Sequence, residues 1–333
     1  KELWAVPFGT TRYGHDGGNA GTRNNSGGDG PRSTPTIDGS RVYVLTSDLL
    51  LACFDAASGR EIWKRDLVRE NEGQNITWKN AASPLIDGDL VYVAGGGSGQ
   101  ALLGINKESG AVVWQTQDDK MTHATPAIGE IHGERQVIFF TQTGLVAVKP
   151  GNGEVLWRHP FRFSVSTAAS PVIAGDIVYC SAGYGVGATA VRVSKSGGKY
   201  SAKELWRSSG NDLANHWSTP IHKDGYLYGM FQFKDYGEGP VKCVELATGK
   251  EIWSQKGFGP GNLILAGSQL VILSDAGELV LAEATPAKYT EKARFQAVSG
   301  KCWSTPALAD GVIYVRSTRE GAAFDASSKL SRQ

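Results

Sequence analysis

The stretch from Ser33 to Trp63 reads STPTIDGSRVYVLTSDLLLACFDAASGREIW and decides the fold prediction. It contains four short runs of strand-forming residues, and turn residues such as Asp38-Gly39 and Ser58-Gly59 separate them. The first run follows Pro35, and the last ends at Trp63. The stretch therefore predicts four consecutive antiparallel strands joined by tight turns.

The same pattern recurs along the chain, and each copy opens with Ser or Thr followed by proline. The opening prolines are Pro35, Pro84, Pro126, Pro171, Pro220 and Pro306. The gaps between them are 49, 42, 45, 49 and 86 residues, so the last gap has room for one more copy. We expect this copy to have lost its proline. Its predicted strands are Leu263 to Ala266, Gln269 to Leu273, Glu278 to Glu283 and Ala293 to Ala297, with Phe295 in the place of the recurring tryptophan.

Seven copies of about 45 residues with four strands each are typical of propeller blades. We therefore predict an all-β, seven-bladed β-propeller of four-stranded antiparallel blades. A blade alone cannot bury both of its faces, so neighbouring blades must cover each other. The tryptophan that ends most copies is expected to pack between adjacent blades, because a large aromatic side chain buries much area.

The N-terminus is predicted to complete the last blade. The seventh copy has no fourth run, whereas Lys1-Glu2-Leu3-Trp4 matches Lys250-Glu251-Ile252-Trp253 closely. Pairing there would close the ring and leave no long unpaired strand edge. We expect a single domain over 1–333, with 1–8 as the outer strand of blade 7, 9–32 as a loop over the funnel face and 33–328 as blades 1 to 7.

Composition excludes some classes of function. The net charge is +1 and no block of basic residues occurs, so nucleic-acid binding is not expected. No apolar run reaches the roughly eighteen residues that a membrane span needs. The chain starts at Lys1 rather than Met, and we interpret it as a mature or trimmed chain from which any export signal has been removed. A periplasmic or otherwise exported location is therefore predicted.

The four cysteines, Cys53, Cys180, Cys243 and Cys302, are far apart in the sequence. Three of them fall within predicted strands of different blades, where a buried thiol acts as a small apolar side chain. We predict neither a disulfide framework nor a metal site from them.

The turn that leads into the fourth strand carries a family resemblance. Phe54 to Trp63 and Glu245 to Trp253 resemble the Asp-Ala-x-Ser/Thr-Gly-x-x-x-Trp ending of PQQ-like (pyrroloquinoline-quinone repeat) β-propellers. Asn106, Lys149 and Val193 stand at the aspartate position in three other copies. The resemblance covers nearly the full chain and implies a propeller fold.

The resemblance implies two different kinds of function. The family includes quinoprotein dehydrogenases, which use PQQ with calcium, and the non-catalytic outer-membrane assembly lipoprotein scaffold. The dehydrogenases resemble eight-bladed rings with large insertions, whereas this chain has seven short copies. They also commonly carry a pair of adjacent cysteines, which this chain lacks. We therefore predict no cofactor, with PQQ and calcium as the alternative. Fold alone does not decide activity.

The candidate site lies in the segments that precede each Ser/Thr-Pro pair, because these segments gather at one face of a propeller around its funnel. The candidate ligand-binding residues are Arg32, Trp78, Asn80, His123, His216, Trp217, Asn262 and Trp303. Flat aromatic surfaces beside hydrogen-bonding groups suit a sugar ring, a quinone or a peptide side chain. The alternative is that these side chains plug the channel. His123 and His216 could act as bases, but no nucleophile accompanies them and no catalytic residue is predicted.

Two further groups of loop residues are expected on the same face. Arg12, Tyr13, His15 and Asp16 could cap the pocket from the long segment that follows the first strand. Tyr184, Phe231, Phe233 and Tyr236 could form an aromatic rim.

These observations leave two hypotheses open. The first is a non-catalytic propeller of the cell envelope that binds a protein partner, or a small polar ligand such as a sugar, at its central funnel. The alternative is an enzyme of quinoprotein-dehydrogenase type, or a carbohydrate-active protein, with its active site in the funnel. The pattern is compatible with a monomer.

Overall fold

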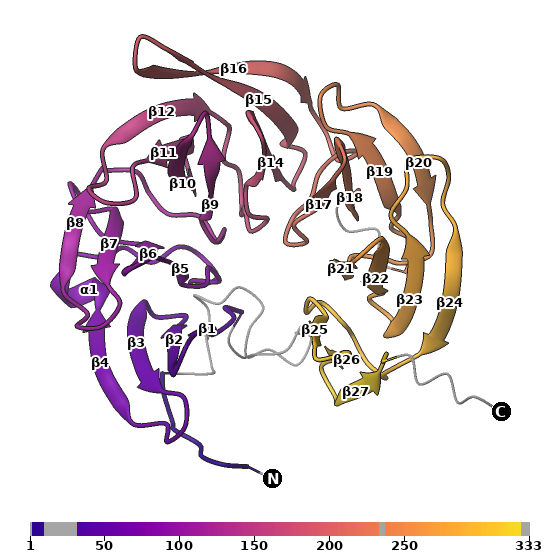
Figure 1. The fold of residues 1–333 in the computed structure, drawn as a ribbon, viewed down its shortest axis with the longest axis horizontal. Helices are drawn as coiled ribbons and strands as arrows, with labels where there is room; N and C mark the ends of the chain where they lie inside the picture. Colours follow the sequence, from indigo (N-terminus) through magenta and orange to yellow (C-terminus); the bar gives the residue numbers. More distant parts are fainter. Residues whose placement is uncertain (1, 10–31, 233–236, 328–333) are drawn as a thin grey trace. The chain divides into compact units, whose positions relative to one another are not determined.

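The computed structural model describes residues 2–9, 32–232 and 237–327 (Figure 1). The protein has the predicted all-β fold of a seven-bladed β-propeller, and its described residues form seven antiparallel sheets. The chain divides into two compact units, which we describe separately. Unit 1 contains Lys1–Ala182 and Ala190–Leu205, and unit 2 contains Gly183–Thr189 and Trp206–Gln333. The single domain over 1–333 stays a prediction.

Unit 1 begins with three complete sheets. The first contains β1 (Thr36–Asp38), β2 (Arg41–Leu45), β3 (Leu50–Asp55) and β4 (Glu61–Asp66). The second contains β5 (Leu85–Asp87), β6 (Leu90–Ala94), β7 (Leu102–Asn106) and β8 (Val112–Thr116). The third contains β9 (Ala127–Ile131), β10 (Glu134–Thr141), β11 (Gly144–Val148) and β12 (Val155–Pro160). Figure 1 shows β4, β8 and β12 along the outer side of this unit and β1, β5 and β9 along its inner side.

The remaining sheets follow in sequence order. The fourth contains β13 (Val172–Ala174), β14 (Ile177–Ala182), β15 (Gly187–Ser196) and β16 (Lys199–Ser208). The fifth contains β17 (Ile221–Lys223), β18 (Tyr226–Met230), β19 (Val241–Glu245) and β20 (Glu251–Gln255). The sixth contains β21 (Asn262–Ala266), β22 (Gln269–Leu273), β23 (Glu278–Glu283) and β24 (Glu291–Gln296). The seventh contains β25 (Ala307–Ala309), β26 (Val312–Arg316) and β27 (Gly321–Asp325).

The opening prolines predict the first residue of each sheet that has one. In all six copies that have one, the first strand begins at the position directly after the proline, as Thr36 follows Pro35. Proline cannot donate to a sheet ladder, so it stands just before the strand rather than inside it. The copy without a proline is confirmed as well, because β21 to β24 lie in the predicted gap.

The recurring tryptophan joins most blades to the next, as predicted. Trp63 on β4 donates from Nε1 to the carbonyl of Lys107 at 2.8 Å, in the last turn of the second sheet. Its ring also covers Gly110, where an added Cβ would lie 2.7 Å from the indole. Gly110 has a φ of 73°, so the turn needs glycine for its backbone and for this contact. The same ring-to-glycine contact recurs in the pairs Trp4–Gly59, Trp114–Gly153 and Trp206–Gly249.

Two blades depart from this pattern. Trp157 donates to the side chain of Gln136 in its own sheet at 2.7 Å. The long β15–β16 hairpin of the next sheet lacks the short turn, and its Tyr200 hydroxyl donates to Glu134 of the third sheet at 2.8 Å. In the sixth sheet, the register places Ala293, not Phe295, at the tryptophan position opposite Leu281. The large side chain, Leu281, therefore lies on the third strand and the small one, Ala293, on the fourth, the reverse of the first and fifth sheets.

The completion of the seventh sheet by residues 1–8 stays a prediction. This sheet has three strands among the described residues, and 2–8 contain no assigned strand. One contact supports the prediction, because Trp4 donates from Nε1 to the carbonyl of Ala56 at 3.0 Å and covers Gly59. Trp4 thus contacts the first sheet as the outer-strand tryptophans contact the blades that follow them.

The core lies between adjacent sheets. One cluster joins Tyr43, Leu51 and Cys53 of the first sheet to Val93 and Leu103 of the second. All four cysteines are buried and none forms a disulfide, and Cys53, Cys180 and Cys243 lie in strands, as expected. A short helix, α1 (Leu67–Glu70), follows β4 and was not predicted. Among the described residues, no helix is long and apolar enough to cross a membrane.

Candidate functional site

The structure brings the predicted funnel residues together in two groups, one in each unit. Arg32, Trp78, Asn80 and His123 belong to unit 1, and His216, Trp217, Asn262 and Trp303 belong to unit 2. A single funnel lined by both groups stays a prediction. The predicted cap residues Arg12, Tyr13, His15 and Asp16 lie outside the described residues, as do Phe233 and Tyr236 of the predicted rim.

The first group is built around a strained turn. Trp78 and Lys79 lie between α1 and β5, and both have left-handed backbones, with φ of 67° and 62°. This conformation costs a residue with a bulky side chain on the order of 1–3 kcal/mol and persists only where the surroundings enforce it. Two such residues in succession therefore need external support.

Predicted site residues supply that support through the backbone. The Arg32 guanidinium donates from Nη1 to the carbonyl of Trp78 at 2.8 Å. His123 donates from Nε2 to the carbonyl of Thr77 at 2.9 Å. Two successive carbonyls of the turn are thus fixed by side chains that are distant in sequence.

The residues after Trp78 anchor the turn from the other side. Lys79 forms an ion pair with Asp48 at 3.0 Å. Asn80 is fully buried, and its Nδ2 donates to the carbonyls of Thr46 at 3.2 Å and Ala82 at 3.0 Å. Asn80 therefore holds the backbone around the turn.

His123 is held as a neutral imidazole. It is buried, and this burial lowers its pKa to about 4, with a further lowering by the Arg32 charge, against the opposing hydrogen bond to Thr77. Because the Thr77 carbonyl can only accept, Nε2 carries the proton. At neutral pH His123 is a positioning residue for the turn.

Trp78 lines a cavity of about 610 Å³ within unit 1. This volume lies in the range of small-molecule sites. The cavity is bounded by the connections between blades 1–2, 2–3 and 3–4 and by the central turns of blades 2 and 3. The lining residues that sequence reasoning missed are Gln74, Asn75, Ile76, Thr77, Gly96, Gly97, Ser98, Asp118, Asp119, Lys120, Met121, Gln142, Phe163, Ser164 and Val165.

Two carboxylates of the cavity are held by hydrogen bonds. Asp118 accepts from Ser98 Oγ at 2.6 Å and from the Gly99 amide at 2.7 Å, and these bonds lower its pKa. Burial raises the pKa of Asp119, but hydrogen bonds from Arg158 and Thr143 outweigh it and lower the pKa overall. Arg158 pairs with Asp119 at 2.7 Å. Both groups are therefore ionised at neutral pH.

The second group packs on itself. In unit 2, the His216 ring lies edge-on to Tyr184 at 5.2 Å and to Trp217 at 5.0 Å between ring centroids. Trp217 packs against Trp303 at 5.2 Å, and the Lys301 ammonium lies 4.7 Å from the Trp303 ring centroid. We call these four rings the aromatic cluster. Such pairs stabilise one another beyond the area they bury.

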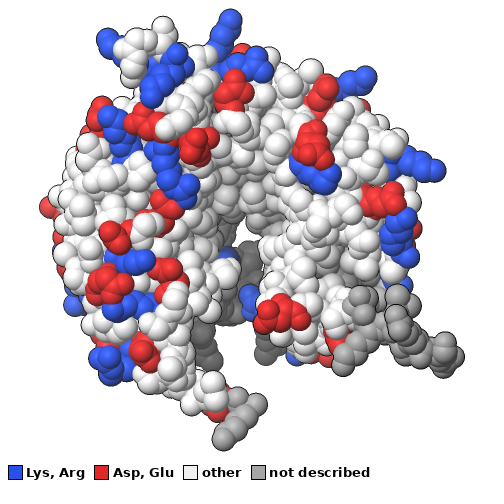
Figure 2. Space-filling model, viewed as in Figure 1, with Lys and Arg blue, Asp and Glu red and all other residues white. Residues whose placement is uncertain are grey.

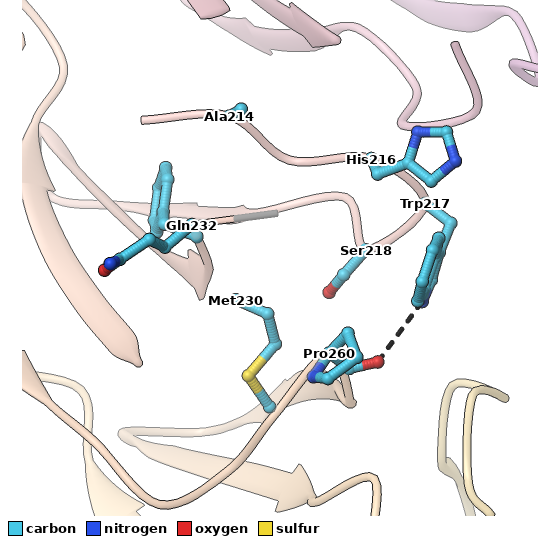
Figure 3. A pocket seen from close by; sticks show the side chains of 8 residues that line it. Ala214, His216, Trp217, Ser218, Met230, Gln232 and Pro260 are labelled. Atoms are coloured by element: carbon cyan, nitrogen blue, oxygen red, sulfur yellow. Dashed lines mark hydrogen bonds between the residues drawn. The ribbon is translucent and has the colours of Figure 1, made fainter. Parts of the chain in front are cut away.

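The cavity beside the aromatic cluster has no room for a ligand. It measures about 20 Å³, close to the space of one water molecule. Figure 3 shows His216, Trp217 and Ser218 on one side and Met230 and Pro260 opposite, with the indole N–H of Trp217 donating to the Pro260 carbonyl at 3.3 Å. Phe231 of the predicted rim lines the same cavity. Asn262 is buried and donates to the Trp303 carbonyl at 2.7 Å.

The described residues do not fit a calcium-bound quinone. Among them, no three His, Cys, Asp or Glu side chains come close enough together to hold a metal ion. Of the two acids of the larger cavity, Asp119 is already paired with Arg158. We therefore derive no chemical step through such a cofactor.

Comparison with known sequences gives one family. The family model described as outer membrane protein assembly factor BamB matches residues 1–230 and 237–329. Outer membrane protein assembly factor BamB of Shewanella oneidensis is 24% identical over 258 residues, covering 73% of this chain and 62% of that protein. The match thus spans less than two thirds of the relative's length.

Comparison with solved structures supports the fold. BamB from Moraxella catarrhalis superposes with a TM-score of 0.66 at 17% identity, covering 88% of this chain and 84% of that one. A quinohemoprotein alcohol dehydrogenase from Pseudomonas putida gives 0.60 at 13% identity, covering 86% and 62%. At these identities the likeness concerns the fold alone.

Proposed function

The chain belongs to the PQQ-repeat propeller family described as outer membrane protein assembly factor BamB, and on that basis we propose that it is a non-catalytic propeller of the cell envelope that binds a protein partner. The observation that carries the proposal is the extent of the family match, which leaves out only 231–236 and 330–333. The proposal includes export to the periplasm and a part in assembling outer membrane proteins, the activity that the relatives' names state.

The character of the surface supports a protein partner rather than a polyanion. The chain has a net charge of +1. On the face drawn in Figure 2, basic and acidic side chains of unit 1 lie beside one another. Mixed charge of this kind favours specific, short-range pairing over the long-range attraction that a polyanion needs.

In each unit, the loops that precede the first strands and carry that unit's predicted funnel residues are the proposed contacts for a partner. In these loops, His123 is held neutral on a backbone carbonyl and His216 is packed between two rings. These arrangements support structural roles for both histidines. The proposal therefore assigns no acid–base role to either side chain.

The experiment is complementation of a Shewanella oneidensis strain that lacks its own relative. The chain is exported to the periplasm, and correctly folded outer membrane protein is measured by its heat-modifiable migration in gels. The proposal predicts partial or full recovery, and the relative's own gene serves as the positive control. Export of the folded chain without any recovery would overturn the proposal.

A further inference from the structure

We propose that the cavity around Trp78 in unit 1, here called the Trp78 cavity, binds a neutral saccharide whose ring stacks on the indole. This inference goes beyond the proposed function, because binding of a protein partner does not require a ligand-sized cavity. It rests on the environment of Trp78, on the rigidity of its turn and on the polar lining.

Trp78 differs from the other tryptophans of unit 1. Trp4, Trp63, Trp114 and Trp157 each donate the indole N–H to an acceptor of the protein, and the last three are buried. Trp78 is only half-buried and lines a cavity of about 610 Å³. Its indole N–H donates to none of the described residues. A ring with an accessible face and an available donor is suited to a ligand that is apolar on one side and polar at its edge.

The turn that carries Trp78 is fixed before any ligand arrives. Its left-handed backbone is enforced by Arg32 and His123 on two successive carbonyls and by the ion pair of Lys79 with Asp48. A side chain placed by so many bonds loses little freedom when a ligand binds, which favours affinity. Strained backbone held in this way is concentrated at ligand-binding sites.

The polar lining selects the class of ligand. Asp118 is ionised and oriented by Ser98 and Gly99, so it can accept hydrogen bonds but cannot donate them. Gln74 adds an amide group to the same wall, and Gln142 adds its amide oxygen while its Nε2 donates to the Met121 carbonyl. Hydroxyl groups satisfy acceptors and amides alike.

Charge disfavours an anionic ligand. Asp118 and Asp119 contribute two carboxylates, and Lys120 is the cation among the lining residues. Arg158 neutralises Asp119 through a bidentate pair, with distances of 3.1 and 2.7 Å. The remaining charges, Asp118 and Lys120, balance each other. A neutral, hydroxyl-rich ring with one apolar face matches this lining best.

The test is isothermal titration calorimetry on the full chain with chitotriose, maltotriose and cellotriose. We expect binding of at least one of the three, and we expect Trp78→Ala to weaken it about tenfold or more. Trp217→Ala in the aromatic cluster is the matched control, and it should leave the affinity within about twofold. No binding of any of the three sugars at about 10 mM would overturn the proposal. Binding that Trp78→Ala leaves unchanged would overturn it too.

Two further variants guard against misfolding. Trp78→Phe keeps a flat ring and should retain measurable binding. Trp78→Gly relieves the left-handed backbone, so its melting temperature should stay near that of the parent chain while saccharide binding is lost. If Trp78→Gly retains the affinity, stacking on the indole is disproved. Binding of an unstructured peptide to the cavity in place of any saccharide would also contradict the proposal.

The complementation experiment separates this site from the proposed function. If Trp78→Ala restores the folding of outer membrane protein in that experiment, the saccharide site is not needed for the proposed function.

Discussion

The Trp78 cavity and the aromatic cluster were predicted by the same reasoning and have different structures. Around each of them, tryptophan and histidine come from segments that precede a first strand. Around Trp78 the polar groups bind the backbone and leave the ring beside about 610 Å³ of space. In the aromatic cluster the rings fill the space themselves, and about 20 Å³ remains.

This difference shows what decides whether an aromatic loop residue is available to a ligand. Trp78 lies on a left-handed turn whose carbonyls are held by Arg32 and His123, whereas Trp217 has Trp303 and His216 within packing distance. Both Trp78 and Trp217 are tryptophans of a loop that precedes a first strand. The backbone conformation and the partner of each ring determine the outcome.

The largest expected effect concerns the predicted completion of the seventh sheet by residues 1–8. The register of the first sheet pairs Ala52 with Lys64, next to Cys53 and Trp63. By the same register, Ala5 should lie opposite Ala322 on β27. We expect Ala5→Cys with Ala322→Cys to form a disulfide on oxidation, because paired strands bring the two Cα atoms within bonding range.

Electrophoresis without reductant, followed by mass spectrometry of the linked peptides, measures this cross-link. Ala5→Cys with Ala309→Cys is the control, since β25 lies two strands away from β27 in the seventh sheet. The four native thiols are buried and should not react. If no disulfide forms between the cysteines of Ala5→Cys/Ala322→Cys, under conditions that oxidise a pair of exposed thiols, residues 1–8 do not pair with β27.

The support of Trp78 by His123 should appear as a dependence of stability on pH. His123 has a pKa of about 4 in the folded protein and about 6.5 when unfolded, so the unfolded chain binds the extra proton. The free energy of unfolding is therefore lowered as the pH falls from about 6.5 to 4, by about 3 kcal/mol from this residue. Above about pH 6.5 the contribution is fully present.

Urea unfolding of the parent chain and of His123→Gln at several pH values checks this prediction. Glutamine can donate to the Thr77 carbonyl but does not titrate, so the stability difference between the two proteins should change by about 3 kcal/mol over the interval. Equal pH profiles for the two proteins would mean that His123 is not held neutral.

The aromatic cluster should respond to mutation through stability rather than through binding. Trp217→Ala removes a ring that touches both His216 and Trp303, and we expect it to cost about 2 kcal/mol. Trp217→Phe keeps an aromatic contact and should cost less. Both values come from urea unfolding. If Trp217→Ala leaves stability intact but abolishes saccharide binding, the roles of the two regions have been exchanged.

Arg32 offers the smallest and most selective change. It is exposed, and its Nη1 donates to the Trp78 carbonyl. Arg32→Ala should alter the free energy of unfolding by less than about 1 kcal/mol. Removing this anchor should weaken saccharide binding about threefold, because the turn loses part of its pre-organisation. Calorimetry on Arg32→Lys gives the control, and an unchanged affinity in Arg32→Ala would show that the other supports suffice.

Much of the fold could be predicted from the sequence because it depends on local, repeated signals. Each opening proline precedes a first strand, and the glycine of three short turns, Gly110, Gly153 and Gly249, marks the contact of a tryptophan from the preceding blade. The exchange of Leu281 and Ala293 was missed because only the pairing register reveals it. Helix α1 was missed because it has four residues, although Asp66 caps it by accepting from the amides of Val68 and Arg69.

The candidate site could be predicted only in part. Loop position and residue type identified Trp78, Arg32 and His123, but they could not separate the ring that faces the cavity from the side chains that hold it. The acidic pair Asp118-Asp119 and the glycine run around Gly96 lie in loops at the cavity, and neither was singled out. Left-handed backbone at a tryptophan has no sequence signal, since it is enforced by residues distant in the chain.

The most direct test of the account is a crystal structure of the protein with the trisaccharide that binds most tightly. The account predicts a sugar ring stacked on Trp78, with hydroxyl groups reaching Asp118, and no ligand at Trp217 or Trp303. A sugar ring stacked within the aromatic cluster, or a Trp78 cavity filled by the protein's own side chains, would contradict it.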